Sequence, residues 1–137
     1  MLFIDRGAKN AASQAANDIS KFITNKRNVT IFPEGTSSGG KDLLKFKPRL
    51  FASCIETNCS IQCVIIKYPH KNKKIHPKVP FIRGNSLFLS ILKILFQNDI
   101  VAEVTISDLV SPIGKDRKSV SNECYTIVKN NLENNAN

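Results

Sequence analysis

Short apolar runs alternate with segments of helical spacing, and this alternation constrains the fold more than any other feature. Residues 2–4 and 29–32 are short runs of β type. Between them, residues 8–24 place apolar side chains three and four positions apart, the pattern of an amphipathic helix. The three segments predict a β-α-β unit, whose crossover is right-handed and whose strands are parallel.

The alternation continues to the end of the chain. The further predicted elements are a helix from Pro48 to about Asn58, a strand over 61–68 covered on both faces, a helix over 87–97 capped by Ser86, a strand over 100–106 with one face exposed, and a final helix capped by Ser119 or Ser121. We therefore predict the α/β class, with a mostly parallel sheet flanked by helices. At 137 residues the chain suits one domain over 1–132, followed by a frayed Asn-rich tail over 133–137.

A hydroxyl-rich loop follows the second predicted strand. Residues 32–38 read Phe-Pro-Glu-Gly-Thr-Ser-Ser, and Arg6 follows the first predicted strand in the same way. Parallel strands bring their carboxyl ends to one edge of a sheet, so Arg6 and Glu34 are expected to lie together and hold an anion and a hydroxyl. Taken separately, Arg6 would be a solvated charge and Pro-Glu-Gly a common turn.

The pairing of these two segments resembles a known family. Phe-Ile-x-Arg at 3–6 followed by Phe-Pro-Glu-Gly-Thr at 32–36 is similar to the second and third sequence blocks of the glycerolipid acyltransferases, and the similarity covers about residues 2–112. It implies a glycerol-3-phosphate acyltransferase-like fold. It also implies an enzyme of phospholipid biosynthesis, which moves a fatty acyl group from acyl-CoA or acyl carrier protein to the hydroxyl of 1-acylglycerol-3-phosphate or a related lyso-lipid.

The resemblance assigns roles to the loop residues. It implies that Arg6 holds the phosphate of the acceptor and that Glu34 and Gly35 position its glycerol part. The full substrate-binding set predicted here is Arg6, Glu34, Gly35, Thr36, Ser37 and Lys47.

Two residues depart from the family pattern. Ser37 stands where an Arg is usual, so one expected phosphate contact is either absent or comes from Lys41, Lys45 or Lys47. Cys63 stands where a proline is usual. These differences suggest an acceptor other than lysophosphatidic acid, such as a lyso-aminolipid.

The general base of the family is the histidine of a His-x-x-x-x-Asp block. His70 and His76 are followed five positions later by Ile75 and Phe81, and both lie in a basic loop without a paired aspartate. No catalytic residue is assigned. The chain resembles the C-terminal part of an acyltransferase, truncated at its N-terminus and expected to be inactive alone. The alternative is a non-catalytic truncated or pseudo-enzyme module that binds glycerophospholipid headgroups.

The net charge of +9 favours anionic partners. Basic residues gather around one loop and form either a solvated face or a docking patch for an anionic membrane: Lys67, Lys71, Lys73, Lys74, Lys78 and Arg83. The apolar stripe of 87–95 is expected to face the core. Nucleic-acid binding would rest on charge alone and is not expected. The longest apolar stretch, 87–96, is about half a membrane span, so a peripheral position on the cytoplasmic side of the membrane is expected.

No metal or redox cofactor is expected, because the reaction needs only the acyl donor as co-substrate. Cys59 and Cys63 fall within loose zinc-binding spacing, with Cys54 and His70 nearby. Structural zinc sites need four convergent ligands, so free cysteines, mostly buried in the core, are the preferred interpretation.

Overall fold

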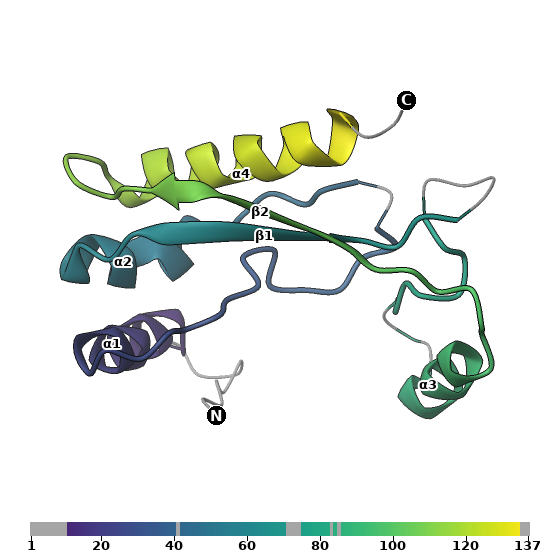
Figure 1. Cartoon of the computed structure of the whole chain (residues 1–137). Coiled ribbons are helices and arrows are strands. Elements are labelled where there is room, and N and C mark those ends of the chain that lie inside the picture. Colours follow the sequence, from purple (N-terminus) through teal and green to yellow (C-terminus); the bar gives the residue numbers. More distant parts are fainter. Residues whose placement is uncertain (1–10, 41, 71–74, 83, 85, 135–137) are drawn as a thin grey trace.

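The computed structural model describes residues 11–40, 42–70, 75–82, 84 and 86–134. Its elements are α1 (Ala11–Thr24), the 3₁₀ helix η1 (Pro48–Phe51), α2 (Ala52–Thr57), β1 (Ile61–Lys67), α3 (Leu87–Leu95), β2 (Glu103–Val110) and α4 (Arg117–Asn134) (Figure 1). Four predicted elements are confirmed within a few residues: the helix from Pro48, the strand at 61–68, and the two helices found as α3 and α4. The predicted strand at 2–4 lies outside the described residues.

The described sheet is antiparallel and has two strands. β1 pairs with β2 in a register that places Val64 opposite Ile106 and Ile66 opposite Val104. Residues 29–32, predicted as a strand, are extended without being part of a sheet. This prediction was wrong for that segment because a short β-type run needs a neighbouring strand to satisfy its backbone groups, and no described strand lies beside it.

The core lies between one face of this sheet and the helices α4, η1 and α2. α4 runs along the sheet, and α1 packs against α2, which lies between α1 and the sheet (Figure 1). The buried residues that form the core cluster are Phe51, Cys54, Cys63, Ile65, Val110, Val120 and Cys124. Burial of apolar side chains, each contributing about 1.5–3 kcal/mol, stabilises this half of the molecule.

The other face of the sheet is not covered by any described element. The apolar side chains on this face are each at least half exposed: Val64, Ile66, Val104 and Ile106. The strand at 61–68 was predicted to be covered on both faces, and the apolar residues of 100–106 to face inward; both expectations were wrong. An irregularity between Gln62 and Val64 shifts the register, so that Val110 alone of the β2 hydrophobic residues points into the core.

α3 stands apart from the body of the molecule (Figure 1). None of its residues is buried, and its apolar side chains, among them Leu87, Phe88 and Leu95, are exposed. The expectation that this stripe faces the core was therefore wrong for the described structure. Ser86 is the N-terminal flanking residue as predicted, but its side chain makes no capping hydrogen bond.

Candidate functional site

A tight turn presents the Pro-Glu-Gly sequence. The backbone N–H of Gly35 donates to the carbonyl oxygen of Phe32 at 3.0 Å, with Pro33 in the second position of the turn and glycine in the fourth, as such turns favour. Gly35 has φ of +70°, a conformation that side chains with a Cβ rarely adopt. The sequence Pro-Glu-Gly therefore fixes the direction in which Glu34 leaves the backbone.

A second segment holds the turn in place. The backbone N–H of Lys47 donates to the carbonyl oxygen of Pro33 at 2.9 Å, and that of Leu44 donates to Glu34 Oε2 at 3.2 Å. The half-buried Glu34 carboxylate thus ties its own turn to the chain ten residues later. Removing it would leave only the backbone bond between Lys47 and Pro33 to join these two segments.

The side chain of Lys47 lies over Gly35. A methyl group built on Gly35 would come within 2.7 Å of Lys47 Nζ and 3.0 Å of its Cε. The absence of a side chain at this position is what allows the amine to approach the turn. The Lys47 ammonium group consequently lies against the backbone of the turn that carries Glu34.

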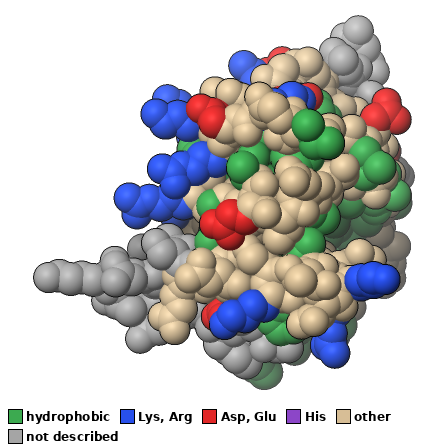
Figure 2. Space-filling model, turned by 90° about the vertical axis from the view of Figure 1, so that its left-hand side faces the viewer, with side chains coloured by type: hydrophobic (Ala, Val, Ile, Leu, Met, Phe, Trp, Pro, Cys, Tyr) green, Lys and Arg blue, Asp and Glu red, His purple; other side chains and the backbone are tan. Residues whose placement is uncertain are grey.

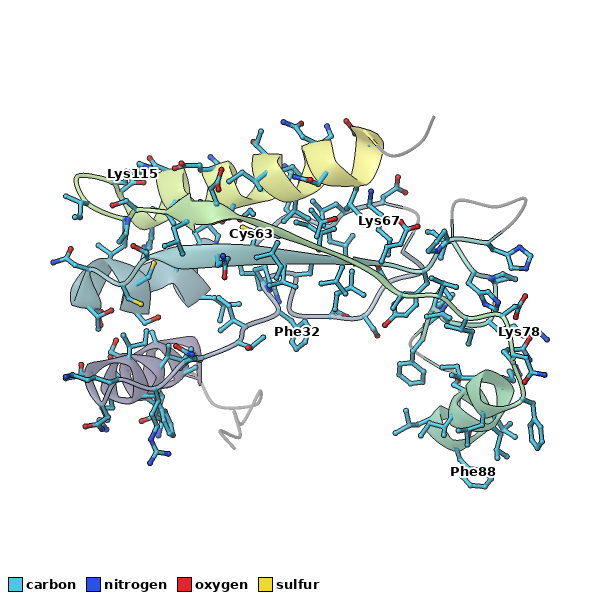
Figure 3. All side chains as sticks on the ribbon, viewed as in Figure 1. Phe32, Cys63, Lys67, Lys78, Phe88 and Lys115 are labelled. Atoms are coloured by element: carbon cyan, nitrogen blue, oxygen red, sulfur yellow. The ribbon has the colours of Figure 1, made fainter. Side chains whose placement is uncertain are left out.

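Hydroxyl groups border this turn. Thr36 and Ser37 are exposed, and Thr36 Oγ1 donates to the carbonyl oxygen of Ser37 at 3.4 Å. The ring of Phe32 is also exposed, beneath the sheet in the view of Figure 3. Neither hydroxyl is locked into the core, so both are available to a ligand.

The structure brings together Glu34, Gly35 and Lys47 of the predicted substrate-binding set, with Thr36 and Ser37 directly following. Arg6 lies outside the described residues, as does Lys41, so the predicted pairing of Arg6 with Glu34 stays a prediction. Lys45 is exposed and Lys47 is the lysine at the turn.

Cys63 is a core residue rather than a member of this site. Its backbone N–H donates to Ser107 Oγ at 3.0 Å. Hydrogen bonding from the Cys124 thiol and from Ser107 lowers the pKa of Cys63, while the same contact and burial raise the pKa of Cys124. All four cysteines are free, and three of them are buried, which agrees with the preferred interpretation. Cys59 is only partly buried.

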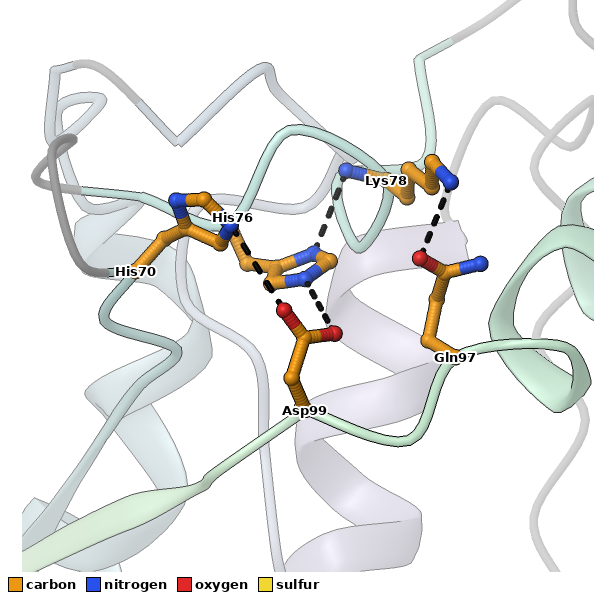
Figure 4. A network of polar contacts seen from close by, with 5 residues as sticks. All are labelled: His70, His76, Lys78, Gln97 and Asp99. Carbon is orange, nitrogen blue, oxygen red and sulfur yellow. Dashed lines mark hydrogen bonds and ion pairs between the residues drawn. The ribbon is translucent and has the colours of Figure 1, made fainter.

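A polar cluster that the sequence did not predict lies beyond the C-terminal end of β1. His70 Nε2 is 3.6 Å from Asp99 Oδ2, and His76 Nε2 is 3.4 Å from Asp99 Oδ1 (Figure 4). The expectation that the histidines lack a partner aspartate was wrong. Asp99 lies more than twenty positions from either histidine in the sequence, and no local pattern connects them.

The basic residues do not all form a free patch. Lys67 Nζ donates to the carbonyl oxygen of Asn131 on α4, and Lys78 Nζ donates to Gln97 Oε1 at 2.9 Å. Lys71, Lys73, Lys74 and Arg83 lie outside the described residues. Figure 2 shows further Lys and Arg side chains at the end of the molecule that carries α1 and α2, so the positive charge is spread over the surface. No helix in the described ranges is both long and apolar enough to cross a membrane.

Comparison with known proteins finds similarity to acyltransferases. A family model described as Acyltransferase matches residues 1–67, which include the Pro-Glu-Gly turn. This match, together with the relatives below, supports assignment of the chain to a glycerolipid acyltransferase family. Over 129 residues the chain is 28% identical to a lyso-ornithine lipid O-acyltransferase of Pseudomonas aeruginosa. This match covers 93% of the chain and 49% of the relative.

Two further relatives are acyltransferases by name. A lysophospholipid acyltransferase of Xenopus tropicalis is 26% identical over 119 residues, covering 85% of this chain and 22% of the relative. A 1-acyl-sn-glycerol-3-phosphate acyltransferase of Neisseria gonorrhoeae is 30% identical over 67 residues, and this match covers 49% of the chain and 26% of the relative. This acyltransferase-family chain thus spans half or less of the length of these relatives. No solved structure matches it at the significance of these curated relatives.

Proposed function

We propose that this chain forms part of an O-acyltransferase that moves a fatty acyl group from acyl-CoA or acyl carrier protein to the hydroxyl of a lysolipid. The observation that carries the proposal is the Pro-Glu-Gly turn, fastened to Lys47 within the region matched by the family model. The names of the relatives, all lysolipid or acylglycerol-phosphate acyltransferases, support the acceptor class.

In the proposed reaction the acceptor hydroxyl oxygen attacks the thioester carbonyl carbon. A C–O ester bond forms, the C–S bond breaks, and the hydroxyl proton passes through a general base to the leaving thiolate. This chemistry uses no metal or redox cofactor. Lys47, together with Arg6, would hold the anionic headgroup, and Glu34 would position the glycerol or amide part beside the hydroxyl.

For the acceptor we favour a lyso-aminolipid over lysophosphatidic acid. Ser37 replaces the arginine that usually follows Gly-Thr, which removes one phosphate contact. The match with the lyso-ornithine lipid acyltransferase extends over 93% of the chain, against 49% for the acylglycerol-phosphate enzyme. Both observations point away from a phosphate-only headgroup. The proposed location is peripheral, on the cytoplasmic side of an anionic membrane attracted by the net charge of +9.

The test uses a longer protein that contains this chain and a His-x-x-x-x-Asp block, with acyl transfer measured for lyso-ornithine lipid and lysophosphatidic acid. Lys47→Ala should raise KM about tenfold or more with a smaller change in kcat, as for loss of a hydrogen bond to a charged group. Lys129→Ala is the control, because Lys129 is an exposed cation on α4 whose Nζ lies 3.9 Å from Glu133. Equal effects of the two variants would leave only nonspecific charge attraction. Headgroup binding without turnover by the longer protein would favour the non-catalytic binding module.

A further inference from the structure

We propose that His70, His76 and Asp99 form a binding site for a divalent transition-metal ion of the zinc type. These three residues are the group of His, Cys, Asp or Glu side chains in the described ranges whose ligand atoms converge, all within 4.8 Å of one another. The site lies apart from the Pro-Glu-Gly turn and is independent of the proposed acyl transfer.

The backbone brings the three side chains together. The N–H of His76 donates to the carbonyl oxygen of Tyr68 at 2.7 Å, which closes the loop after β1 and sets the two imidazole rings edge to face with centroids 5.0 Å apart. Asp99 arrives from the connection between α3 and β2. Figure 4 shows its carboxylate directed between the two rings, with one oxygen toward each.

The separations fit ligation better than hydrogen bonding. N–H···O hydrogen bonds span about 2.7–3.2 Å, and charge-assisted ones are shorter. The two Nε2···O separations are 3.6 and 3.4 Å. Two ligands of a tetrahedral ion, each about 2.0–2.1 Å from the metal, stand about 3.3–3.4 Å apart. An ion can therefore be held between the carboxylate and the two rings once the ligand atoms, which all lie within 4.8 Å of one another, adjust to it.

The donor set has the chemistry that such an ion prefers. Two imidazole nitrogens and one carboxylate oxygen suit Zn²⁺ and its neighbours among the first-row metals. The side chain of His76 is 2% exposed, whereas those of His70 and Asp99 are 29% and 57% exposed. The site thus has a buried floor and an open side, where water can complete the coordination.

Hydrogen bonding within the protein does not account for the arrangement. His70 Nδ1 is buried and has no partner among the described atoms. His76 Nδ1 accepts a long hydrogen bond, 3.3 Å, from the backbone N–H of Lys78. Binding of an ion at Nε2 would place the ring proton on Nδ1, facing the N–H of Lys78, so this weak bond would be given up on metal binding. The simpler alternative, two rings drawn to one carboxylate by charge alone, predicts no metal affinity.

The experiment titrates residues 1–137 with Zn²⁺ by calorimetry and with Co²⁺ by visible absorption. The expected result is one ion per chain, a d–d spectrum of low coordination number, and no thiolate charge-transfer bands. The sequence contains only two histidines, so the imidazole NMR signals report on this cluster alone, and both should shift with Zn²⁺.

Asp99→Asn and His70→Ala should each weaken Zn²⁺ binding about tenfold or more, because even second-shell changes cost that much. Both side chains are partly exposed, so these variants are expected to fold, and circular dichroism checks this. His76 is buried and is therefore left unchanged. Cys59→Ser is the control and should bind like the unaltered chain. Absence of stoichiometric Zn²⁺ binding, or loss of binding in Cys59→Ser with retention in His70→Ala, would overturn the proposal.

Discussion

Gly35 is the residue at which backbone conformation and the candidate site meet. Its φ of +70° and its contact with the Lys47 side chain make two separate demands for glycine. Gly114 makes only the first demand, since it has φ of +73° and open space around its Cα. Substitutions at these two glycines therefore separate the cost of the left-handed conformation from an effect on the candidate site.

We predict that Gly35→Ala and Gly114→Ala each lower the free energy of unfolding by about 1–2 kcal/mol, the penalty of a left-handed conformation for a residue with a Cβ. Only Gly35→Ala should also weaken lysolipid binding, because its methyl group displaces the Lys47 amine. Urea unfolding and a binding titration measure the two effects. Equal loss of binding in both variants would remove Lys47 from the site.

At the scale of single residues, the sequence predicted the turn better than its surroundings. The heptapeptide at 32–38 signals a turn through Pro33 and Gly35, whose conformational preferences are local. The sequence left three lysines as candidates for the anion contact; the structure places Lys47 beside the turn, and its contact with an anion stays a prediction. The His70 and Asp99 contact depends on how two distant loops meet, which no local preference encodes.

At the scale of elements, the apolar runs predicted where helices and strands occur better than which of their faces is buried. The strand at 61–68 was found at Ile61–Lys67, and a regular helix followed Pro48. The face of β2 was inverted, because alternation shows that a strand has two faces and not which face the tertiary structure covers. Residues 29–32 failed as a strand for a related reason, since pairing requires a partner that the run itself does not specify.

Asp116 caps α4, although Ser119 or Ser121 was expected to do so. Asp116 Oδ1 accepts from the backbone N–H of Ser119 at 2.7 Å, and this bond lowers the pKa of Asp116 below its ordinary 3.8. A carboxylate with a lowered folded-state pKa stabilises the protein above its unfolded pKa, and the stabilisation is lost as the pH falls through the folded-state pKa.

We predict that Asp116→Ala lowers the melting temperature at neutral pH by removing the cap. The difference from the unaltered chain should shrink as the pH falls well below 3.8. Thermal unfolding followed by circular dichroism across this range is the measurement, with exposed Asp108→Ala on β2 as the control. A difference that does not change with pH would mean that the charge of Asp116 has no part in capping.

Val120 on α4 tests the core between this helix and the sheet. It is fully buried, at 0% exposure, whereas Val104 on β2 is 57% exposed. We predict that Val120→Ala lowers the free energy of unfolding by about 1–3 kcal/mol through lost burial and a residual cavity. Val104→Ala should change it by less than about 0.5 kcal/mol. Similar values for the two, measured by urea unfolding, would contradict the described packing of α4.

At the scale of the whole molecule, one face of the sheet is packed and the other is not covered by any element that the structure describes. A two-stranded sheet is marginal by itself, and apolar patches of this kind are uncommon on monomeric proteins. We predict that residues 1–137 alone self-associate, and that Ile66→Thr with Val104→Thr reduces the associated fraction in light scattering. Ile113→Thr, at an exposed position outside the sheet, should not. Unchanged association in the double variant would place the contact elsewhere.

The last prediction concerns catalysis by these 137 residues in isolation. Neither histidine begins a His-x-x-x-x-Asp block, and loss of a general base lowers the rate by on the order of a hundred to ten thousand fold. The structure does pair both rings with Asp99, but this pair lacks the spacing of the family's block and His76 is buried, so neither histidine is expected to act as the general base.

We therefore expect no acyl transfer above background from acyl-CoA to a lysolipid by residues 1–137, and turnover by a longer protein that includes the histidine block. Lysolipid binding, followed by calorimetry, should survive in the short chain and fall with Lys47→Ala. Turnover by the short chain that disappears in His70→Ala would show that the Asp99 cluster supplies the base. Turnover that survives that change would mean that acyl transfer in this family member does not depend on a histidine.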